Sequence, residues 1–160
     1  KTVFMYQENS LTWLERNKGK FKFDIIIIDG DHNYFTVSKE LELIKSFCME
    51  HTIILCDDYY GKYSERDLYY ADREEYADVS LATRIKESER TEKQGVKNAI
   101  DDFVNRKDCP YVLQEFKGSS YCILYPKGYN FDVFETTGIS RDDVIVLQKM
   151  NSDFKGNPFI

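Results

Sequence analysis

The sequence predicts an α/β fold, and three observations carry this prediction. Short apolar runs alternate with segments whose apolar residues recur at helical spacing. Two of the runs, Phe23 to Ile28 ("FDIIII") and Thr52 to Cys56 ("TIILC"), are each followed at once by acidic residues. The segment between them has the length and the periodicity of a crossover helix. We therefore expect a right-handed βαβ unit whose two strands are parallel.

The first half of the chain adds further elements. Thr2 to Tyr6 has the composition of a strand, and Asn9 is suited to cap a short helix that begins at Ser10. The uninterrupted run Phe23 to Ile28 is typical of a strand buried on both faces of a parallel sheet. The crossover helix, with Asp31 or Asn33 as its cap near Tyr34, is indicated by apolar residues at helical spacing: Val37, Leu41, Ile44, Phe47 and Cys48.

The second half predicts a helix and a hairpin after a long interruption. Residues 59–94 are charged, rich in tyrosine and too long for a simple connection, so we expect a lid, an insertion or a mobile loop, or else a solvated, partly helical excursion. "GVKNAIDDFVNR", from Gly95, is an amphipathic helix. Tyr111 to Phe116 and Tyr121 to Tyr125 flank turn residues and form an antiparallel hairpin. We expect one domain over residues 1–125 and a C-terminal extension over 126–160, whose one apolar run is Val144 to Leu147.

Composition and charge exclude several classes of protein. The chain has 160 residues and a net charge of −6, without a block of lysine or arginine, which argues against nucleic acid as a partner. No apolar stretch reaches the roughly 20 residues of a membrane span. The four cysteines form no C-x-x-C pair, so a reducing, cytoplasmic setting is expected. The sequence opens with Lys1 and enters an apolar run directly, so we expect an excerpt or a processed product.

The acidic residues that follow the two central strands are the candidate site. Asp29 and Asp57 both stand just beyond the carboxyl ends of neighbouring parallel strands, where ligands bind in open sheets. Together with Asp58 they form an oxygen-only set that suits Mg²⁺, Mn²⁺ or Ca²⁺. Alternatively, acids at these positions cap the helices that follow. His32 is a candidate general base or a partner that holds an aspartate, whereas His51 is expected on the surface.

Three segments in this order, "FDIIIIDGDHNY", "CDDYY" and "GVKNAIDDF", resemble the class I S-adenosylmethionine-dependent methyltransferases. The resemblance is greatest to the branch with the macrocin-type and catechol-type O-methyltransferases, and it covers residues 1–125. It implies a Rossmann-like sheet, mostly parallel with an antiparallel C-terminal hairpin and with the strand order 3-2-1-4-5-7-6. Thr2 to Tyr6 would then be the third strand, and the N-terminal strands would be missing from this chain.

The resemblance also implies cofactors and a reaction. Such an enzyme binds S-adenosylmethionine and, in its metal-dependent members, Mg²⁺ or another divalent ion. It transfers the methyl group in line to a hydroxyl oxygen of a small molecule or a sugar. The implied site residues are Asp29, Asp57 and Asp58 for the metal, Asp31 or His32 for the catalytic base, and Asn9, Ser10 and Asp29 for the methyl donor.

One departure from the family leaves alternatives open. The sequence has no G-x-G-x-G loop and no acidic residue after a second strand, both of which the family takes from its first two strands. We therefore expect the C-terminal part of a methyltransferase domain, associated with a missing N-terminal portion or in a homo-oligomer. The alternatives are a metal-independent relative in which His32 is the base, and a non-catalytic remnant or interaction module. A nicotinamide-dependent enzyme has no support, because its fingerprint is equally absent.

Overall fold

The computed structural model describes residues 4–74, 90–116 and 118–129. The chain divides into two compact units, Lys1–Lys127 and Gly128–Ile160, and all elements below belong to the first unit. In order along the chain they are α1 (Ser10–Asn17), β1 (Phe23–Ile28), α2 (Tyr34–Ile44), the 3₁₀ turn η1 (Lys45–Phe47), β2 (Cys48–Cys56), the 3₁₀ turn η2 (Tyr70–Asp72), α3 (Val96–Val104), β3 (Tyr111–Glu115) and β4 (Cys122–Pro126). The predicted apolar run Val144 to Leu147 lies outside the described residues.

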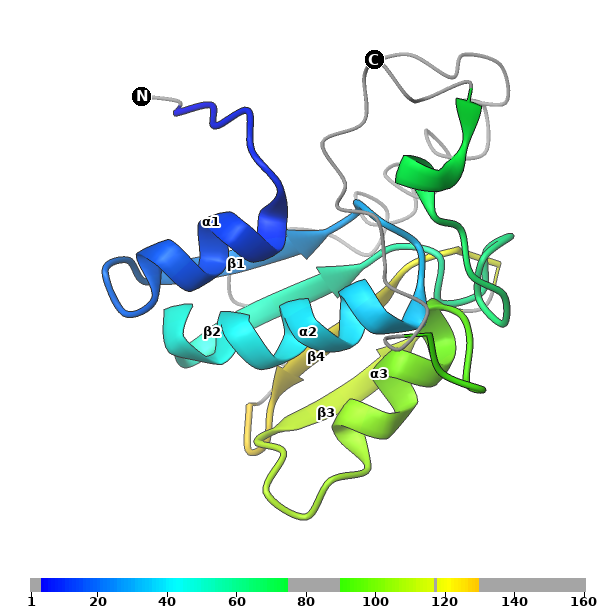
Figure 1. Cartoon of the computed structure of the whole chain (residues 1–160). Helices are drawn as coiled ribbons and strands as arrows, with labels where there is room; N and C mark the ends of the chain where they lie inside the picture. The colour runs from blue at the N-terminus through cyan, green and yellow to red at the C-terminus, as the bar shows by residue number, and fades with distance from the viewer. Residues whose placement is uncertain (1–3, 75–89, 117, 130–160) are drawn as a thin grey trace. The chain divides into compact units, whose positions relative to one another are not determined.

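The four strands form one mixed sheet in the order β1-β2-β4-β3 (Figure 1). β1 and β2 are parallel, as the crossover through α2 predicts, and their register places Ile28 opposite Cys56. β4 is antiparallel to both of its neighbours, β2 and β3. The described sheet therefore has one parallel and two antiparallel pairs, and β4 is the strand that runs against the other three. The predicted C-terminal hairpin is confirmed, with each strand starting within one residue of its expected position.

Side chains at the helix starts explain where α1 and α2 begin. The side-chain oxygen of Asn9 accepts hydrogen bonds from the backbone N–H groups of Leu11 and Thr12, as an N-cap residue does. The side-chain oxygen of Asn33 accepts from the N–H of Thr36 at 2.7 Å. Of the two residues that the sequence offered as the cap of α2, Asn33 takes this position.

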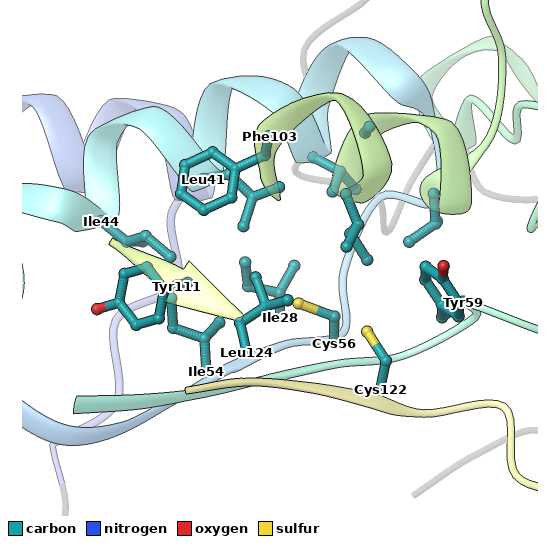
Figure 2. Packing of buried hydrophobic residues seen from close by; sticks show 14 of the residues in the cluster. Ile28, Leu41, Ile44, Ile54, Cys56, Tyr59, Phe103, Tyr111, Cys122 and Leu124 are labelled. Atoms are coloured by element: carbon teal, nitrogen blue, oxygen red, sulfur yellow. The ribbon is translucent and has the colours of Figure 1, made fainter. Parts of the chain in front are cut away.

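The hydrophobic core lies between the helices and one face of the sheet. Figure 2 shows Leu41 of α2 and Phe103 of α3 above Ile54 of β2 and Leu124 of β4, and all four side chains are fully buried. Leu14 of α1 packs against the same cluster.

The prediction that β1 is buried on both faces is wrong for the described residues. Ile28 belongs to the core and Ile26 packs against it, but Ile25 and Ile27 are each 63% exposed. Successive side chains of a strand point to opposite faces. Ile26 and Ile28 belong to the cluster that includes residues of α1, α2 and α3, and these three helices lie over one face of the described sheet (Figure 1). The run of four isoleucines therefore does not indicate from the sequence that only one face of this strand is covered in the described residues.

The predicted strand Thr2 to Tyr6 is also not found in its described part, residues 4–6. Residues 1–3 lie outside the described chain, and Phe4, Met5 and Tyr6 are exposed and have no strand geometry. Within the described residues β1 pairs on one side only, with β2. A strand requires a hydrogen-bonded neighbour, and residues 4–6 have none in this part of the chain.

Two further details differ from the sequence-based expectation or extend it. Cys48 begins β2 and does not end the helix, since the helical stretch closes through η1 at Phe47. β2 accordingly starts four residues earlier than predicted and includes His51, which is exposed as expected and contacts Asp24.

The four cysteines are free. None of the helices in the described residues is long and apolar enough to cross a membrane.

Candidate functional site

The carboxyl ends of β1 and β2 bring acidic side chains and a histidine together. Asp29 and Asp57 directly follow the paired residues at the ends of the two strands, and the N–H of Asp57 donates to the carbonyl of Ile28 at 3.0 Å. One carboxylate or imidazole atom from each of Asp29, His32 and Asp57 lies within 4.8 Å of the others. The convergence expected from parallel strands is therefore present in the structure.

His32 lies in the middle of this group. Its Nε2 atom is 3.5 Å from Oδ1 of Asp29 and 3.9 Å from Oδ2 of Asp57, while its Nδ1 atom is 3.9 Å from Oδ2 of Asp58. Neither ring nitrogen has a hydrogen-bond partner in the part of the chain that the structure describes. Asp58 thus approaches His32 at Nδ1, whereas Asp29 and Asp57 approach it at Nε2.

The backbone at Asp58 is unusual. Its φ of 58° is the one left-handed, non-glycine conformation among the described residues. Aspartate tolerates this region better than most residues because its short side chain bonds locally. The backbone reversal lets two consecutive aspartates approach the same imidazole from different directions, which an extended continuation of β2 would not allow.

The electrostatics of the group are set by burial and by mutual contact. The interaction with His32 lowers the pKa of Asp29. Burial raises the pKa of Asp57, although a hydrogen bond from the Ser120 hydroxyl at 2.8 Å partly offsets this. Burial would lower the pKa of His32, but the interactions with Asp29, Asp58 and Asp57 outweigh it and raise the pKa. The surplus of negative charge thus favours a cation at this point, either a proton on His32 or a metal ion.

The donor set fits a divalent metal ion. Asp29 and Asp57 offer carboxylate oxygens and His32 an imidazole nitrogen, a combination that suits first-row ions such as Mn²⁺. With Asp58 in place of His32 the set would be oxygen-only and would suit Mg²⁺. Asp31, the other candidate base, is partly buried, and burial raises its pKa to about 6.

Tyrosines from the segment after β2 and from the β3–β4 loop surround the group. The ring of Tyr63 stacks on His32 with 5.8 Å between centroids and an interplanar angle of 8°, and Tyr70 lies 6.4 Å from His32 at a tilt. Burial raises the pKa of the Tyr121 hydroxyl, and the charges of Asp57, Asp29 and Asp58 raise it further. Three phenol side chains therefore border the acidic group.

Asp67 holds the segment after β2 in place. Its Oδ1 accepts from the N–H of Tyr34 at 2.8 Å and from the N–H of Gly95 at 2.7 Å, so one carboxylate binds the start of α2 and the residue before α3. Next to it, the N–H of Leu68 donates to the carbonyl of His32 at 2.9 Å. A negative charge at two helix N-termini is favourable, and this contact ties the tyrosine-bearing segment to the loop of His32.

A hollow lies beside the acidic group, between α1, the end of β1 and α2. Its volume is about 380 Å³, within the range of roughly 300–1,000 Å³ that is typical of small-molecule sites. Its lining joins apolar and polar side chains: Tyr6, Glu8, Ser10, Trp13, Leu14, Ile26, Ile27, Ile28, Asp29, Gly30, Glu40 and Ile44. Ser10 and Asp29, two of the three residues expected at the methyl donor, are among them. The side-chain oxygen of the third, Asn9, is occupied in capping α1.

Two polar residues of this region were not singled out from the sequence. Asp67 lies in the long tyrosine-rich segment, and its partners are 33 and 28 residues away, so nothing local marks it. Glu40 is buried in α2 at 6% exposure. The burial of Glu40 could have been predicted from the sequence, because Glu40 is three residues from Val37 and four from Ile44 and thus lies on their apolar face of the helix.

The chain is similar to one family of known proteins. A family described as a methyltransferase domain has a model that matches residues 1–59. This segment contains α1, β1, α2, β2 and the residues of the acidic group, and the match supports a methyltransferase domain there. No curated protein and no solved structure matches the chain.

Proposed function

We propose that the chain carries the metal and acceptor side of an S-adenosylmethionine-dependent methyltransferase. The reaction would be metal-assisted O-methylation of a hydroxyl on a small molecule or a sugar. The observation that carries the proposal is the group of Asp29, His32 and Asp57 at the carboxyl ends of β1 and β2, next to a hollow of ligand size. The methyltransferase family match spans both features.

The strand order supports the finer assignment to the class I fold. The resemblance implies the order 3-2-1-4-5-7-6, whose second half is 4-5-7-6. The observed order β1-β2-β4-β3 corresponds to it strand for strand, with the reversed strand in the position of the seventh. The three helices lie over one face of the described sheet (Figure 1).

The hollow is the proposed site of the methyl donor. Ser10 and Glu8 line one side of it, while Asp29 and Gly30 line the side next to the acidic group. A donor bound there with its nucleoside part against α1 would extend toward Asp29. The sulfonium methyl group would then face the acceptor site beside His32.

The proposed metal site is formed by Asp29 and Asp57, with Asp58 completing the set, so that His32 is left to act as the base. A bound divalent ion would orient the acceptor hydroxyl and lower its pKa. The tyrosines around the group, Tyr63 and Tyr121, offer aromatic and hydroxyl surface to a sugar or aromatic acceptor.

We propose His32 as the general base, in preference to Asp31. Its two ring nitrogens have no hydrogen-bond partner in the described residues, and they face the aspartates where the acceptor would bind. In the reaction the acceptor oxygen forms a bond to the methyl carbon as the bond from that carbon to sulfur breaks. The hydroxyl proton passes to Nε2 or Nδ1 of His32, and the donor leaves as a neutral thioether.

The second candidate is a methyltransferase-like module that does not bind the donor, because the 160 residues themselves supply no G-x-G-x-G loop to hold it. Both candidates are tested by incubating the full-length protein with methyl-labelled S-adenosylmethionine and panels of catechols and sugars, in Mg²⁺, in Mn²⁺ and in chelator. Label transfer that requires the metal and fails in His32→Gln supports the enzyme. No transfer to any acceptor, together with no binding of the donor, supports the second candidate.

A further inference from the structure

Ser120 contacts the acidic group from a distant part of the chain. It lies in the loop between β3 and β4, and its hydroxyl donates to Oδ1 of Asp57 at 2.8 Å, across 63 positions of sequence. The topology of the sheet explains this contact. β4 is antiparallel to β2, and Cys122 of β4 pairs with Cys56 of β2. The residues that lead into β4 therefore lie beside the residues that follow β2.

The two carboxylate oxygens of Asp57 face different partners. Oδ1 accepts from Ser120, while Oδ2 lies 3.9 Å from Nε2 of His32. The backbone N–H of Asp57 donates to the carbonyl of Ile28, so its backbone is held to the end of β1. The last torsion of an aspartate side chain is broad. The hydrogen bond at Oδ1 is therefore what sets the direction of Oδ2.

Ser120 is itself held in place, which a residue that orients another requires. Its carbonyl accepts from the N–H of Tyr60 at 3.2 Å, so the loop is bound to the turn after β2 through its backbone as well. The hydroxyl of the preceding residue, Ser119, accepts from the N–H of Tyr121 at 3.1 Å. The Ser120 hydroxyl is thus presented to Asp57 from a loop with contacts of its own.

We propose that Ser120 is a positioning residue for the proposed metal site, and that its hydroxyl holds the Asp57 carboxylate with Oδ2 turned toward the acidic group. This inference rests on the proposed function, since it concerns the affinity of that site for a divalent ion. Ser120 acts through Asp57. Residues that hydrogen-bond a metal ligand typically contribute about 10- to 100-fold to metal affinity.

The test is the titration of Mn²⁺ into the full-length protein, followed by calorimetry or by the electron paramagnetic resonance signal of free Mn²⁺. Ser120→Ala removes the hydroxyl, and Ser120→Thr keeps a hydroxyl at the same position. Ser119→Ala is the matched control, because it removes a hydroxyl of the same loop whose contact is with the backbone of Tyr121. Urea denaturation of each variant records stability separately from metal binding.

We expect Ser119→Ala to bind Mn²⁺ as the wild-type protein does and Ser120→Ala to bind it about 10- to 100-fold more weakly. Ser120→Thr should recover most of the affinity, because it restores the donor. In a protein that already carries Asp57→Ala, the further change Ser120→Ala should cause no additional loss, because the two residues act as one unit. If Ser120→Ala does not fold, Ser120→Cys replaces it, since a thiol is a weak donor.

A purely structural role of Ser120 would lower stability and leave the affinity for Mn²⁺ unchanged. That result, or an equal loss of affinity with and without the Asp57 carboxylate, would overturn the inference and leave the proposed function intact. Absence of Mn²⁺ binding to the wild-type protein would overturn the proposed metal site together with the inference.

Discussion

The Nε2 atom of His32 lies 3.5 Å from an oxygen of Asp29, three residues earlier in the chain. Both residues of this contact lie in the loop after β1. Asp57 and Asp58 approach the same ring from the end of β2. A single imidazole thus touches three carboxylates from two parallel strands. Removal of any one carboxylate should change the affinity of this group for cations more than it changes the fold.

Metal binding gives the first prediction. Asp57→Asn removes one negative charge from the group, and we expect the affinity for Mn²⁺ to fall by at least about tenfold. Asp24→Asn, on the exposed start of β1, is the matched control and should bind Mn²⁺ as the wild-type protein does. Isothermal titration or the electron paramagnetic resonance signal of free Mn²⁺ measures both. Equal affinities for Asp57→Asn and the wild-type protein would show that the acids do not hold a metal.

Asp67 gives the second prediction, which concerns stability. Asp67→Ala leaves two backbone N–H groups at the starts of α2 and α3 without their acceptor. We expect a loss of roughly 1.5–3 kcal/mol in the free energy of unfolding, measured by urea denaturation. Asp108→Ala, at an exposed position, should change the free energy of unfolding by less than about 0.5 kcal/mol. A change in Asp67→Ala as small as that of the control would contradict the bridging role.

The close approach of two loops at Gly95 gives the third prediction. Gly95 has φ of 85°, and a Cβ atom there would lie 2.2 Å from the carbonyl oxygen of Ser64. Gly19 also has a positive φ, 75°, but a Cβ atom added there would meet no other atom within 4 Å. Substitution of Gly19 therefore measures the cost of backbone strain alone, without a steric clash. We expect Gly19→Ala to cost about 1 kcal/mol in thermal or urea unfolding and Gly95→Ala about 2 kcal/mol or more. Equal costs would mean that the segment after β2 does not pack closely against the start of α3.

The pH dependence of stability gives the fourth prediction. The folded-state pKa of Glu40 is about 7, above its ordinary value of 4.5, so the folded protein binds the proton more tightly than the unfolded chain. The stabilising contribution of the neutral side chain is therefore complete below pH 4.5 and is lost as the pH rises to about 7. Glu40→Gln stays neutral throughout.

We therefore expect Glu40→Gln to match the wild-type protein in stability near pH 4.5 and to exceed it above pH 7, by up to roughly 3 kcal/mol. Asp31 and His32, the charged groups that act on Glu40, titrate in both proteins, so most of their effect cancels. Urea denaturation across this pH range provides the comparison. A difference that stays constant with pH would mean that Glu40 is not buried as an acid.

The parts of the fold that the sequence predicts are those set by local pattern and by nearest-neighbour topology. The apolar period of Val37, Leu41 and Ile44 fixes α2, and the strand–helix–strand order makes β1 and β2 parallel. Parallel strands end at one edge, so the meeting of Asp29 and Asp57 follows without knowledge of the structure.

The parts that could not be predicted depend on partners far along the chain. Ile25 and Ile27 resemble their buried neighbours in the sequence, and only the absence of a layer over them in the described residues shows that their face is exposed. Asp67 acquires its partners from α2 and from the residue before α3 after the chain has folded back. Asp58 approaches Nδ1 of His32 because its backbone is left-handed, and no pattern in the sequence predicts this conformation.

The most direct test of the central claim is a calorimetric titration of S-adenosylmethionine into the full-length protein, with and without Mg²⁺, and into this 160-residue chain beside it. The proposed donor site predicts saturable binding to the full-length protein that weakens in Ser10→Ala. Weaker or no binding to the 160-residue chain would mean that further residues complete the site. No binding to the full-length protein under any metal condition would contradict the methyltransferase proposal, and the acidic residues after β1 and β2 would then serve only to order their loops.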